Sequence, residues 1–437
     1  MTDSHVGRSG RRLTATVTDL EVTRQKGFLV GVVLHGDDPD DAQRSLDELA
    51  LLTDTAGSDP LDSILVNRDA IDPATYIGSG KAAELAAETT ALDIDVVVFD
   101  NPLSPAQQRN LQKVFDCDVV DREAVILDIF AENATTRQGA LQVELALYRY
   151  NLPRLRGKGR EMSQQQGGIG AKRGPGETKL ETDRRRIQQR ITRLTRELDD
   201  ASRVLATQRK ARKRSSAPHV ALVGYTNAGK STLLNRLTDA DVLTEDRLFS
   251  TLDSTVRKLH LPTGPAAVIS DTVGFVRRLP HHLVEAFRST LIEVREADLL
   301  LHVVDATDPD PAGQIEAVRE VLVEIDADRI PQRLVFNKID MTADTSLRRL
   351  QNLYPDASFV SARTGEKIDV LQAAMAGDLE DQTTLLRLAI PYERGDVVAS
   401  AHRLGDVVAE KHDEHGTVLD VRVPAHAVGS FQAFTTD

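Results

Sequence analysis

The feature that most constrains this chain is an eight-residue glycine-rich segment, GYTNAGKS, at residues 224–231. It fits the phosphate-binding pattern G-x-x-x-x-G-K-[ST] at every fixed position. A mostly apolar run of strand length precedes it at 219–223, and residues 232–237 follow with the apolar spacing of a helix. A strand, a glycine turn and a helix N-terminus direct backbone N–H groups and the helix dipole toward an anion. The segment therefore predicts a nucleoside triphosphate site in an α/β domain.

This phosphate-binding loop (the P-loop, residues 224–231) supplies two side chains with predicted roles. Lys230 is expected to reach the β- and γ-phosphates and to act in catalysis, and the Ser231 hydroxyl is expected to bind Mg²⁺. The other predicted nucleotide contacts here are Gly224, Tyr225, Thr226, Asn227, Ala228, Gly229 and Thr232. The alternative is a chance glycine-rich turn, which the strand and helix on either side disfavour.

Two later segments predict the parts that respond to the γ-phosphate. Thr251 is the predicted switch threonine, a ligand of Mg²⁺ and part of the catalytic set, with Thr255 as the alternative because spacing alone does not decide between them. A strand at 266–270 leads to Asp271, expected to hold Mg²⁺, and to Gly274, whose N–H is expected to meet the γ-phosphate and so to act in catalysis. The predicted nucleotide contacts in these segments are Phe249, Ser250, Thr251, Leu252, Asp253, Asp271, Thr272, Val273 and Gly274. An aspartate at a strand end can also simply cap a turn.

The sequence NKID at residues 337–340 predicts the base. The Asp340 carboxylate can accept two hydrogen bonds from the N1–H and 2-amino groups of guanine, whereas adenine would leave that acceptor unpaired. In the rest of the predicted base site, Asn337 and Lys338 are expected to brace the site and stack on the base, with Ile339 between them and Asp340. Ser361 and Ala362 are expected to contact the guanine oxygen through their backbones. The predicted nucleotide is GTP.

Catalysis is less constrained by the sequence. Phe275 stands where Ras-like enzymes place a glutamine that orients water, and an apolar ring cannot do this. Intrinsic hydrolysis is therefore expected to be slow and to need a partner. Arg277 and Arg278 either act as an arginine finger within the chain or face solvent or a partner.

The middle of the chain is basic. Residues 149–214 hold roughly 20 Lys and Arg against about 7 Asp and Glu, in a chain of net charge −13. A helix at 141–152, a glycine-rich loop and a long helix at 177–214 predict an antiparallel hairpin, and its charge indicates a contact with folded RNA. The predicted RNA contacts are Arg173, Lys179, Arg184, Arg185, Arg186 and Arg190. The alternative is a solvated helix face neutralised by acidic neighbouring domains.

Segments on either side of these parts predict two smaller domains. Residues 27–132 alternate between strand and helix patterns, which favours a mostly parallel sheet. The segment YIGSGK at 76–81 lacks the first P-loop glycine and the final Ser or Thr, so we interpret it as a turn before a helix, with a second nucleotide site as the alternative. Strands at 385–390 and 419–423 around a helix at 395–412 indicate a small α+β domain.

The expected organisation is an α/β multidomain chain. It has a flexible N-terminus (1–26), an α/β domain (27–137), a basic helical hairpin (138–215), a GTPase domain (216–380) and a C-terminal α+β domain (381–437). A single cysteine excludes an internal disulfide, and no apolar run is long enough to span a membrane. We expect a cytoplasmic monomer. The strong net negative charge also suggests a halophilic source, because salt screens self-repulsion.

The motifs together resemble one family. GYTNAGKS, FSTLD, DTVGF and NKID occur with YIGSGK, NPLSPAQQRNLQ, LDIFAENATTRQGALQVELA and GPGETKLETDRRRI, a combination similar to the HflX family of ribosome-associated GTPases over residues 27–380. The resemblance implies binding to the large ribosomal subunit and its RNA, with splitting or rescue of stalled ribosomes. Ser250 and Ser254 stand where Ala and Pro are common, which leaves the geometry of that switch loop open. The alternatives are an RNA remodeller acting off the ribosome and a regulatory GTPase that works through protein partners.

Overall fold

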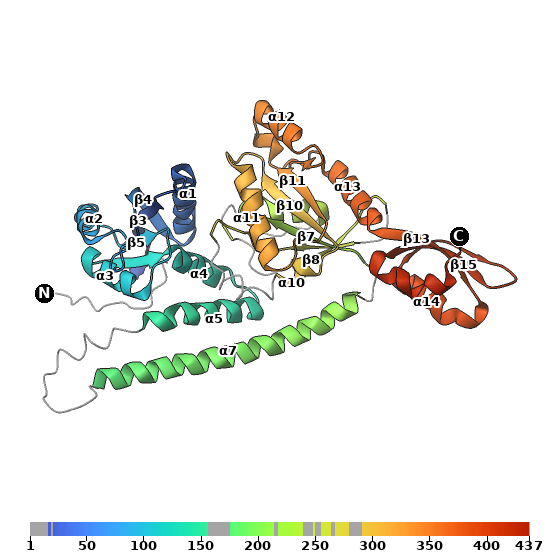
Figure 1. Ribbon diagram of the computed structural model, residues 1–437, viewed down its shortest axis with the longest axis horizontal. Helices are drawn as coiled ribbons and strands as arrows, with labels where there is room; N and C mark the ends of the chain where they lie inside the picture. Colours follow the sequence, from blue (N-terminus) through green and yellow to red (C-terminus); the bar gives the residue numbers. More distant parts are fainter. Residues whose placement is uncertain are drawn as a thin grey trace. The chain divides into compact units, whose positions relative to one another are not determined.

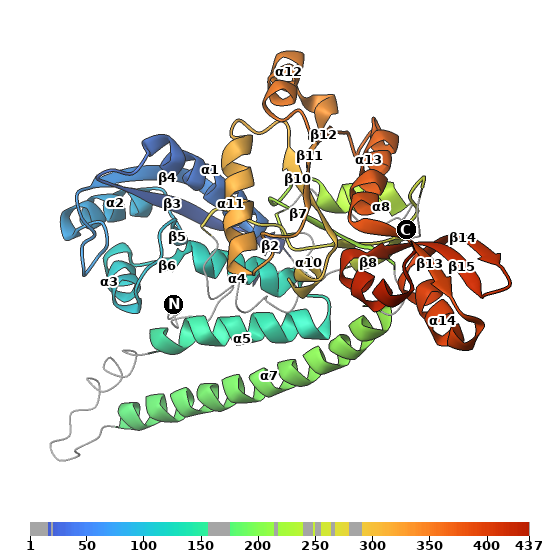
Figure 2. The same ribbon diagram turned by 45° about the vertical axis from the view of Figure 1, so that its right-hand side comes forward.

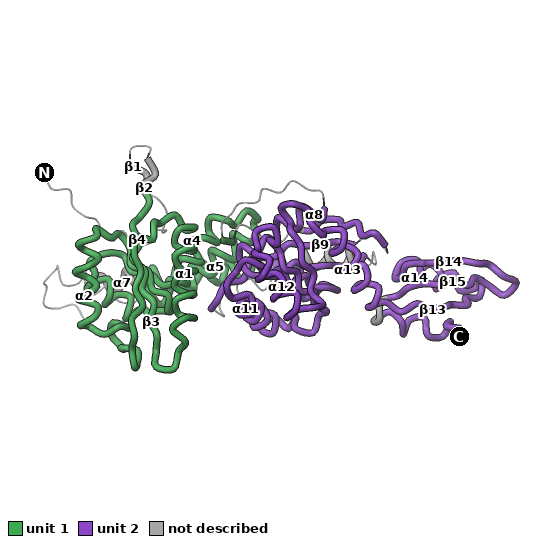
Figure 3. The backbone as a smooth tube through the Cα atoms, turned by 90° about the horizontal axis from the view of Figure 1, so that it is seen from above, with its two compact units in different colours: residues 1–198, 247–249, 279–286 green, residues 199–246, 250–278, 287–437 purple. Residues whose placement is uncertain are grey.

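The computed structural model describes residues 16–18, 21–155, 175–213, 217–238, 248–249, 255–263, 267–278 and 291–436. They form two compact units (Figure 3). The first unit comprises residues 1–198 with 247–249 and 279–286, and the second comprises 199–246, 250–278 and 287–437. Within the segment expected to be a flexible N-terminus, β1 (Thr16–Thr18) pairs antiparallel with β2 (Glu21–Thr23).

The first unit contains the parallel sheet that the alternating pattern predicts. Its strand order is β4-β3-β5-β6, and all pairs are parallel. The strands are β3 (Gln25–Leu34), β4 (Ser58–Arg68), β5 (Val96–Phe99) and β6 (Asp118–Asp121). The helices that follow them in turn are α1 (Pro39–Thr55), α2 (Ser79–Ala91), α3 (Pro105–Phe115) and α4 (Arg122–Asn133). Every residue of β5 is buried, as expected for a central strand that has helices on both faces.

The predicted helical hairpin is also present. Helices α5 (Arg137–Arg154) and α7 (Pro175–Lys213) lie side by side in Figures 1 and 2. An apolar seam joins α5 to the part of α7 that belongs to the first unit, and it consists of Leu141, Leu145 and Leu194 with Tyr148, Ile191 and Leu198 at its margin. The absence of Pro and Gly from residues 177–213 lets α7 continue without interruption.

The second unit is built around a six-stranded sheet in the order β12-β11-β10-β7-β9-β8. Its strands are β7 (His219–Gly224), β8 (Thr255–Leu259), β9 (Ala267–Asp271), β10 (Leu299–Asp305), β11 (Gln332–Asn337) and β12 (Ser358–Phe359). All pairs are parallel except β8 with β9. The helices of this part are α8 (Lys230–Thr238), α10 (Ile292–Arg295), α11 (Pro311–Glu324), α12 (Asp344–Leu353) and α13 (Ile368–Asp381). This doubly wound arrangement brings the carboxyl ends of the parallel strands to one edge, where such folds bind ligands.

The C-terminal part has the expected α+β composition, but one predicted helix is too long. Helix α14 (Gly395–Leu404) ends early, and residues 406–412, predicted as helix, form strand β14 (Asp406–His412). The strand order is β13 (Thr383–Ile390), β15 (Thr417–Pro424), β14. The break falls at Gly405, which lies tightly against β15. A Cβ at this position would lie 2.6 Å from the Val421 side chain and 2.7 Å from the Arg422 carbonyl, so only glycine fits there. In the part of the chain that the structure describes, no helix is both long and apolar enough to cross a membrane.

Candidate nucleotide and magnesium site

Each of the two fixed glycines of the P-loop is required by a different steric constraint. Gly224 ends β7 with φ +154°, and a Cβ there would lie 2.2 Å from the Val303 carbonyl oxygen of β10. Gly229 has φ +88°, and a Cβ there would lie 2.3 Å from Nδ2 of Asn337. The first glycine lets the loop cross the neighbouring strand closely, and the second leaves room for a residue of the predicted base site. The P-loop therefore folds between β7 and α8 as the pattern predicts.

Lys230 points back over its own loop. Its Nζ donates to the carbonyl oxygens of Gly224, at 3.1 Å, and of Tyr225, at 2.8 Å. The side chain is buried, and burial lowers the pKa of the Lys230 ammonium to about 8, against a smaller opposing effect of Asp271. Phosphate oxygens at this position would favour the charged form again. The lysine is held where a triphosphate would meet it.

Two predicted Mg²⁺ ligands lie together beside this lysine. The Ser231 hydroxyl donates to Oδ2 of Asp271 at 2.6 Å, and Asp271 is almost fully buried at the end of β9. Mg²⁺ binds hard oxygen ligands and typically uses only one or two from the protein, together with phosphate and water. The donor set of a serine hydroxyl and one carboxylate therefore fits this ion. Thr251, the third predicted ligand, lies outside the described residues, and the backbone of its alternative, Thr255, pairs with Asp271 at the start of β8.

Gly274 lies directly against the P-loop. A Cβ at Gly274 would be 2.7 Å from the Thr226 methyl group and 3.1 Å from Nζ of Lys230. The glycine thus brings its backbone next to the lysine that is expected to hold the γ-phosphate. The side chain of Phe275, which follows, is fully buried, so it belongs to the core and takes no part in orienting water.

At the predicted base site, Asn337 connects its own loop to two others. Its Nδ2 donates to the Ala228 carbonyl and its Oδ1 accepts from the Ala362 N–H, both at 2.9 Å. The neighbouring Lys338 has φ +65°, and its Nζ lies 2.7 Å from Oδ2 of Asp305. These two hydrogen bonds of Asn337 link the P-loop to the Ser361–Ala362 segment, which is the arrangement that a bracing role requires.

The Asp340 carboxylate has two protein donors. The Ser361 hydroxyl donates to Oδ1 at 2.7 Å, and the Arg363 guanidinium donates to Oδ2. The hydrogen bond from Ser361, followed by that from Arg363, lowers the pKa of Asp340. A carboxylate held ionised in this way can accept both guanine donors once Arg363 moves aside, and the Arg363 side chain is 70% exposed. Sequence reasoning did not identify Arg363 or Asp305, since neither belongs to a fixed motif position.

The predicted contacts from the first switch segment are not brought to this site. Ser250, Thr251, Leu252 and Asp253 lie outside the described residues. Phe249 is described, but it is buried in the first unit, where its ring packs edge-on against Phe130 of α4 with 4.6 Å between centroids. Its predicted contact with the nucleotide stays a prediction.

The predicted RNA-binding residues differ in their surroundings. Arg190 pairs through two hydrogen bonds, of 2.9 and 2.8 Å, with Glu144 of α5 and so closes the hairpin. Arg184, Arg185 and Arg186 are exposed on α7, and Arg186 lies 3.8 Å from Asp183. Lys179 belongs to α7, whereas Arg173 is outside the described residues.

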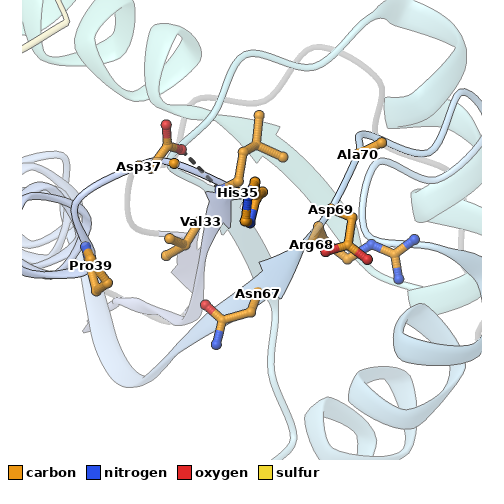
Figure 4. Close-up of a pocket in the computed structure, with 10 residues that line it drawn as sticks. Val33, His35, Asp37, Pro39, Asn67, Arg68, Asp69 and Ala70 are labelled. Carbon is orange, nitrogen blue, oxygen red and sulfur yellow. Dashed lines mark hydrogen bonds between the residues drawn. The ribbon is translucent and has the colours of Figure 1, made fainter.

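The N-terminal turn at residues 76–81 leads into α2, as interpreted from the sequence, with Gly78 as the N-cap at φ +84°. A separate pocket of about 530 Å³ opens at the carboxyl ends of β3 and β4 (Figure 4). Its polar lining comes from His35, Asp37, Asn67, Arg68 and Asp69. The glycine turn is not among the residues that line this pocket, but Gly78 lies beside Arg68, which does, since a Cβ at Gly78 would be 3.2 Å from Nη2 of Arg68. A second nucleotide site stays an alternative prediction.

The fold and the site define a class of protein. Three features together make a P-loop GTPase: a P-loop after β7, an aspartate at the end of β9 with a glycine three residues later, and Asn-Lys-x-Asp at the end of β11. Residues 43–131 match the family described as "GTP-binding GTPase N-terminal", residues 133–212 "GTP-binding GTPase Middle Region", and residues 219–338 "50S ribosome-binding GTPase".

Known relatives narrow the class. The GTPase HflX of Lacrimispora saccharolytica is 45% identical over 413 residues, covering 94% of this chain and 97% of the relative. The GTPase HflX of Escherichia coli is 44% identical over 388 residues, covering 88% and 91%. A crystal structure of a GTP-binding protein from Sulfolobus solfataricus in complex with GDP matches with 21% identity and a TM-score of 0.42, covering 82% of this chain and 99% of that one. The chain belongs to the HflX family of GTPases, and it binds and hydrolyses GTP.

Proposed function

We propose that this GTPase binds the large ribosomal subunit in its GTP–Mg²⁺ form, separates or rescues stalled ribosomes, and is released by hydrolysis. The observation that carries the proposal is a row of exposed arginines on α7, on the same chain as a P-loop whose Ser231 contacts Asp271. The "50S ribosome-binding GTPase" description of residues 219–338 supports the same partner. Since translating ribosomes are cytoplasmic, the proposal places the protein in that compartment, and nothing in it requires more than a monomer.

The nucleotide would be held by residues already close together. Lys230 and the P-loop N–H groups bind the β- and γ-phosphates, Ser231 and Asp271 hold Mg²⁺, and Asp340 reads guanine. Mg²⁺ held there would offset the negative charge of the phosphates. Thr251 completes this set in the proposal as the residue that senses the γ-phosphate.

The hairpin would provide the RNA contact. Arg184 and Arg185 are exposed, and neither has an ion-pair partner among the residues that the structure describes. Arg185 and the exposed Arg196 are eleven positions apart, about 16 Å along a helix, on the side away from the apolar seam. Unpaired guanidinium groups in such a row suit the phosphates of a folded RNA, and binding should then release counterions.

Cosedimentation with isolated ribosomal subunits tests this function. We expect binding to large subunits with a non-hydrolysable GTP analogue and much weaker binding with GDP. Turnover that ignores ribosomes but responds to naked RNA would instead support an RNA remodeller, and no response to either would support a regulatory GTPase.

A charge-matched pair of variants tests the hairpin. Arg184→Gln with Arg185→Gln should weaken subunit binding and flatten its dependence on salt. Arg348→Gln with Arg349→Gln, on exposed positions of α12, changes the net charge equally and should leave binding intact. Equal effects of the two pairs would remove the hairpin from the proposal.

A further inference from the structure

Residues 275–277, which follow Gly274, are joined to the P-loop by backbone contacts. The Phe275 N–H donates to the Gly224 carbonyl at 3.1 Å, and its own carbonyl accepts from the Thr226 N–H at 2.7 Å. Two residues on, the Arg277 N–H donates to the Tyr225 hydroxyl at 2.6 Å. Gly274 is therefore held between the end of β9 and a segment bonded to the P-loop.

The Arg277 side chain extends this attachment to the start of α11. Its Nη2 lies 2.6 Å from Oδ2 of Asp310, and the two side chains are only 16% and 28% exposed. The other oxygen of the same carboxylate accepts from the Gly313 N–H at 3.0 Å, which makes Asp310 the N-cap of α11. One carboxylate thus caps the helix and holds the arginine.

Gly313 leaves the room that this ion pair needs. A Cβ there would lie 2.1 Å from Oδ2 of Asp310 and 2.7 Å from Nη2 of Arg277. Both neighbours are the ends of flexible side chains, so an alanine would be accommodated by parting them and not by moving the backbone. Glycine is a poor helix residue, and at this position its small size is what lets the arginine lie against the first turn of α11.

We propose that Arg277 is a positioning residue for GTP hydrolysis, acting through Asp310 and the Tyr225 hydroxyl to hold the Gly274 N–H where it meets the γ-phosphate. The inference rests on the proposed GTP site. Because the side chain of Phe275 is buried, a preorganised backbone donor at Gly274 takes a larger share of transition-state stabilisation. The same ion pair keeps Arg277 from acting as an arginine finger in this arrangement. GDP lacks the γ-phosphate, so the effect should be specific to GTP.

Three variants break the ion pair in different ways. Arg277→Met removes the cation, Asp310→Ser removes the anion but retains an N-cap side chain, and Gly313→Ala adds a methyl group between the two. Arg333→Met is the matched control, because Arg333 pairs with Asp378 at a similar exposure of 20% and 24% in the same unit. For each protein, the affinities for GDP and for a non-hydrolysable GTP analogue, kcat, KM and the midpoint of thermal unfolding are measured.

We expect about tenfold lower affinity for the analogue and about tenfold lower kcat in the three variants, which is the loss of one charge-assisted contact. GDP affinity should change less than about twofold. The double variant Arg277→Met/Asp310→Ser should be no worse than either single change, since both single changes break the same ion pair. The control should lose thermal stability alone. An unchanged ratio of GTP to GDP affinity together with unchanged kcat in Arg277→Met and Asp310→Ser would overturn the inference, as would equal losses for both nucleotides. Failure of the unmodified chain to bind either nucleotide would refute the GTP site itself.

Discussion

The substitution Asp340→Asn should exchange guanine for xanthine. The structure indicates how the amide would orient: its oxygen keeps the 2.7 Å hydrogen bond from the Ser361 hydroxyl at the Oδ1 position, and its NH₂ group occupies the Oδ2 position. That NH₂ group would face the 2-amino group of guanine, so two donors meet. The 2-oxo group of xanthine would accept from it instead.

The expected magnitude follows from the bonds that change. GTP loses one hydrogen bond to a charged acceptor, worth about 1.5–3 kcal/mol, and leaves a donor unsatisfied at a further cost of about 1–3 kcal/mol. Affinity for GTP should therefore fall by about two to four orders of magnitude, since about 1.4 kcal/mol corresponds to a factor of ten. Arg363 also loses its acceptor, but its side chain is 70% exposed, so water compensates.

Competition between fluorescent nucleotides and unlabelled GTP or XTP measures the exchange. Asp305→Asn is the matched control: it removes the carboxylate that pairs with Lys338 and should weaken both nucleotides without reversing their order. If Asp340→Asn keeps the preference for GTP over XTP, the assignment of Asp340 as the guanine acceptor is wrong.

Three further predictions address the P-loop and the charge of the chain. Gly224→Ala should abolish nucleotide binding and lower the thermal midpoint, because its Cβ would lie 2.2 Å from the Val303 carbonyl; calorimetry and nucleotide titration would show this, and unaltered binding would contradict it. The pKa of Lys230 is lowered to about 8 in the nucleotide-free fold, from 10.5, so the unfolded chain binds more protons between those values and the free energy of unfolding should rise with pH there. This rise should be absent from Lys230→Met, and identical pH profiles of the two proteins would count against the buried lysine. Finally, the net charge of −13 should make the fold more stable in strong salt than in dilute buffer, and denaturation at several salt concentrations that shows no gain would refute this.

The sequence predicted the site best where a local pattern carries the geometry. The P-loop occupies eight consecutive residues, and strand, turn and helix are all determined within that window, so Lys230 and Ser231 lie where expected. Asn337 could be assigned as a brace because it follows a recognisable strand. In each case a local pattern is enough to place the residue in the fold.

Other features depend on contacts that local patterns do not contain. Arg277 and Asp310 are 33 positions apart, and nothing near either residue indicates its partner. The predicted helix at 395–412 was wrong after Leu404, because the crossing of Gly405 over β15 is a tertiary constraint that outweighs helical spacing. The pairing of Phe249 with Phe130 joins residues more than a hundred positions apart, and no periodicity could have predicted it.

The position of Asn337 has a consequence for how the nucleotide is recognised. The side-chain amide of Asn337 hydrogen-bonds both the P-loop, at Ala228, and the segment beside the predicted base site, at Ala362. Gly229 leaves the space that this amide occupies. The predicted contacts to the base and those to the phosphates therefore share one supporting residue. Loss of Asn337 should therefore reduce both the preference for guanine and the affinity for the phosphates.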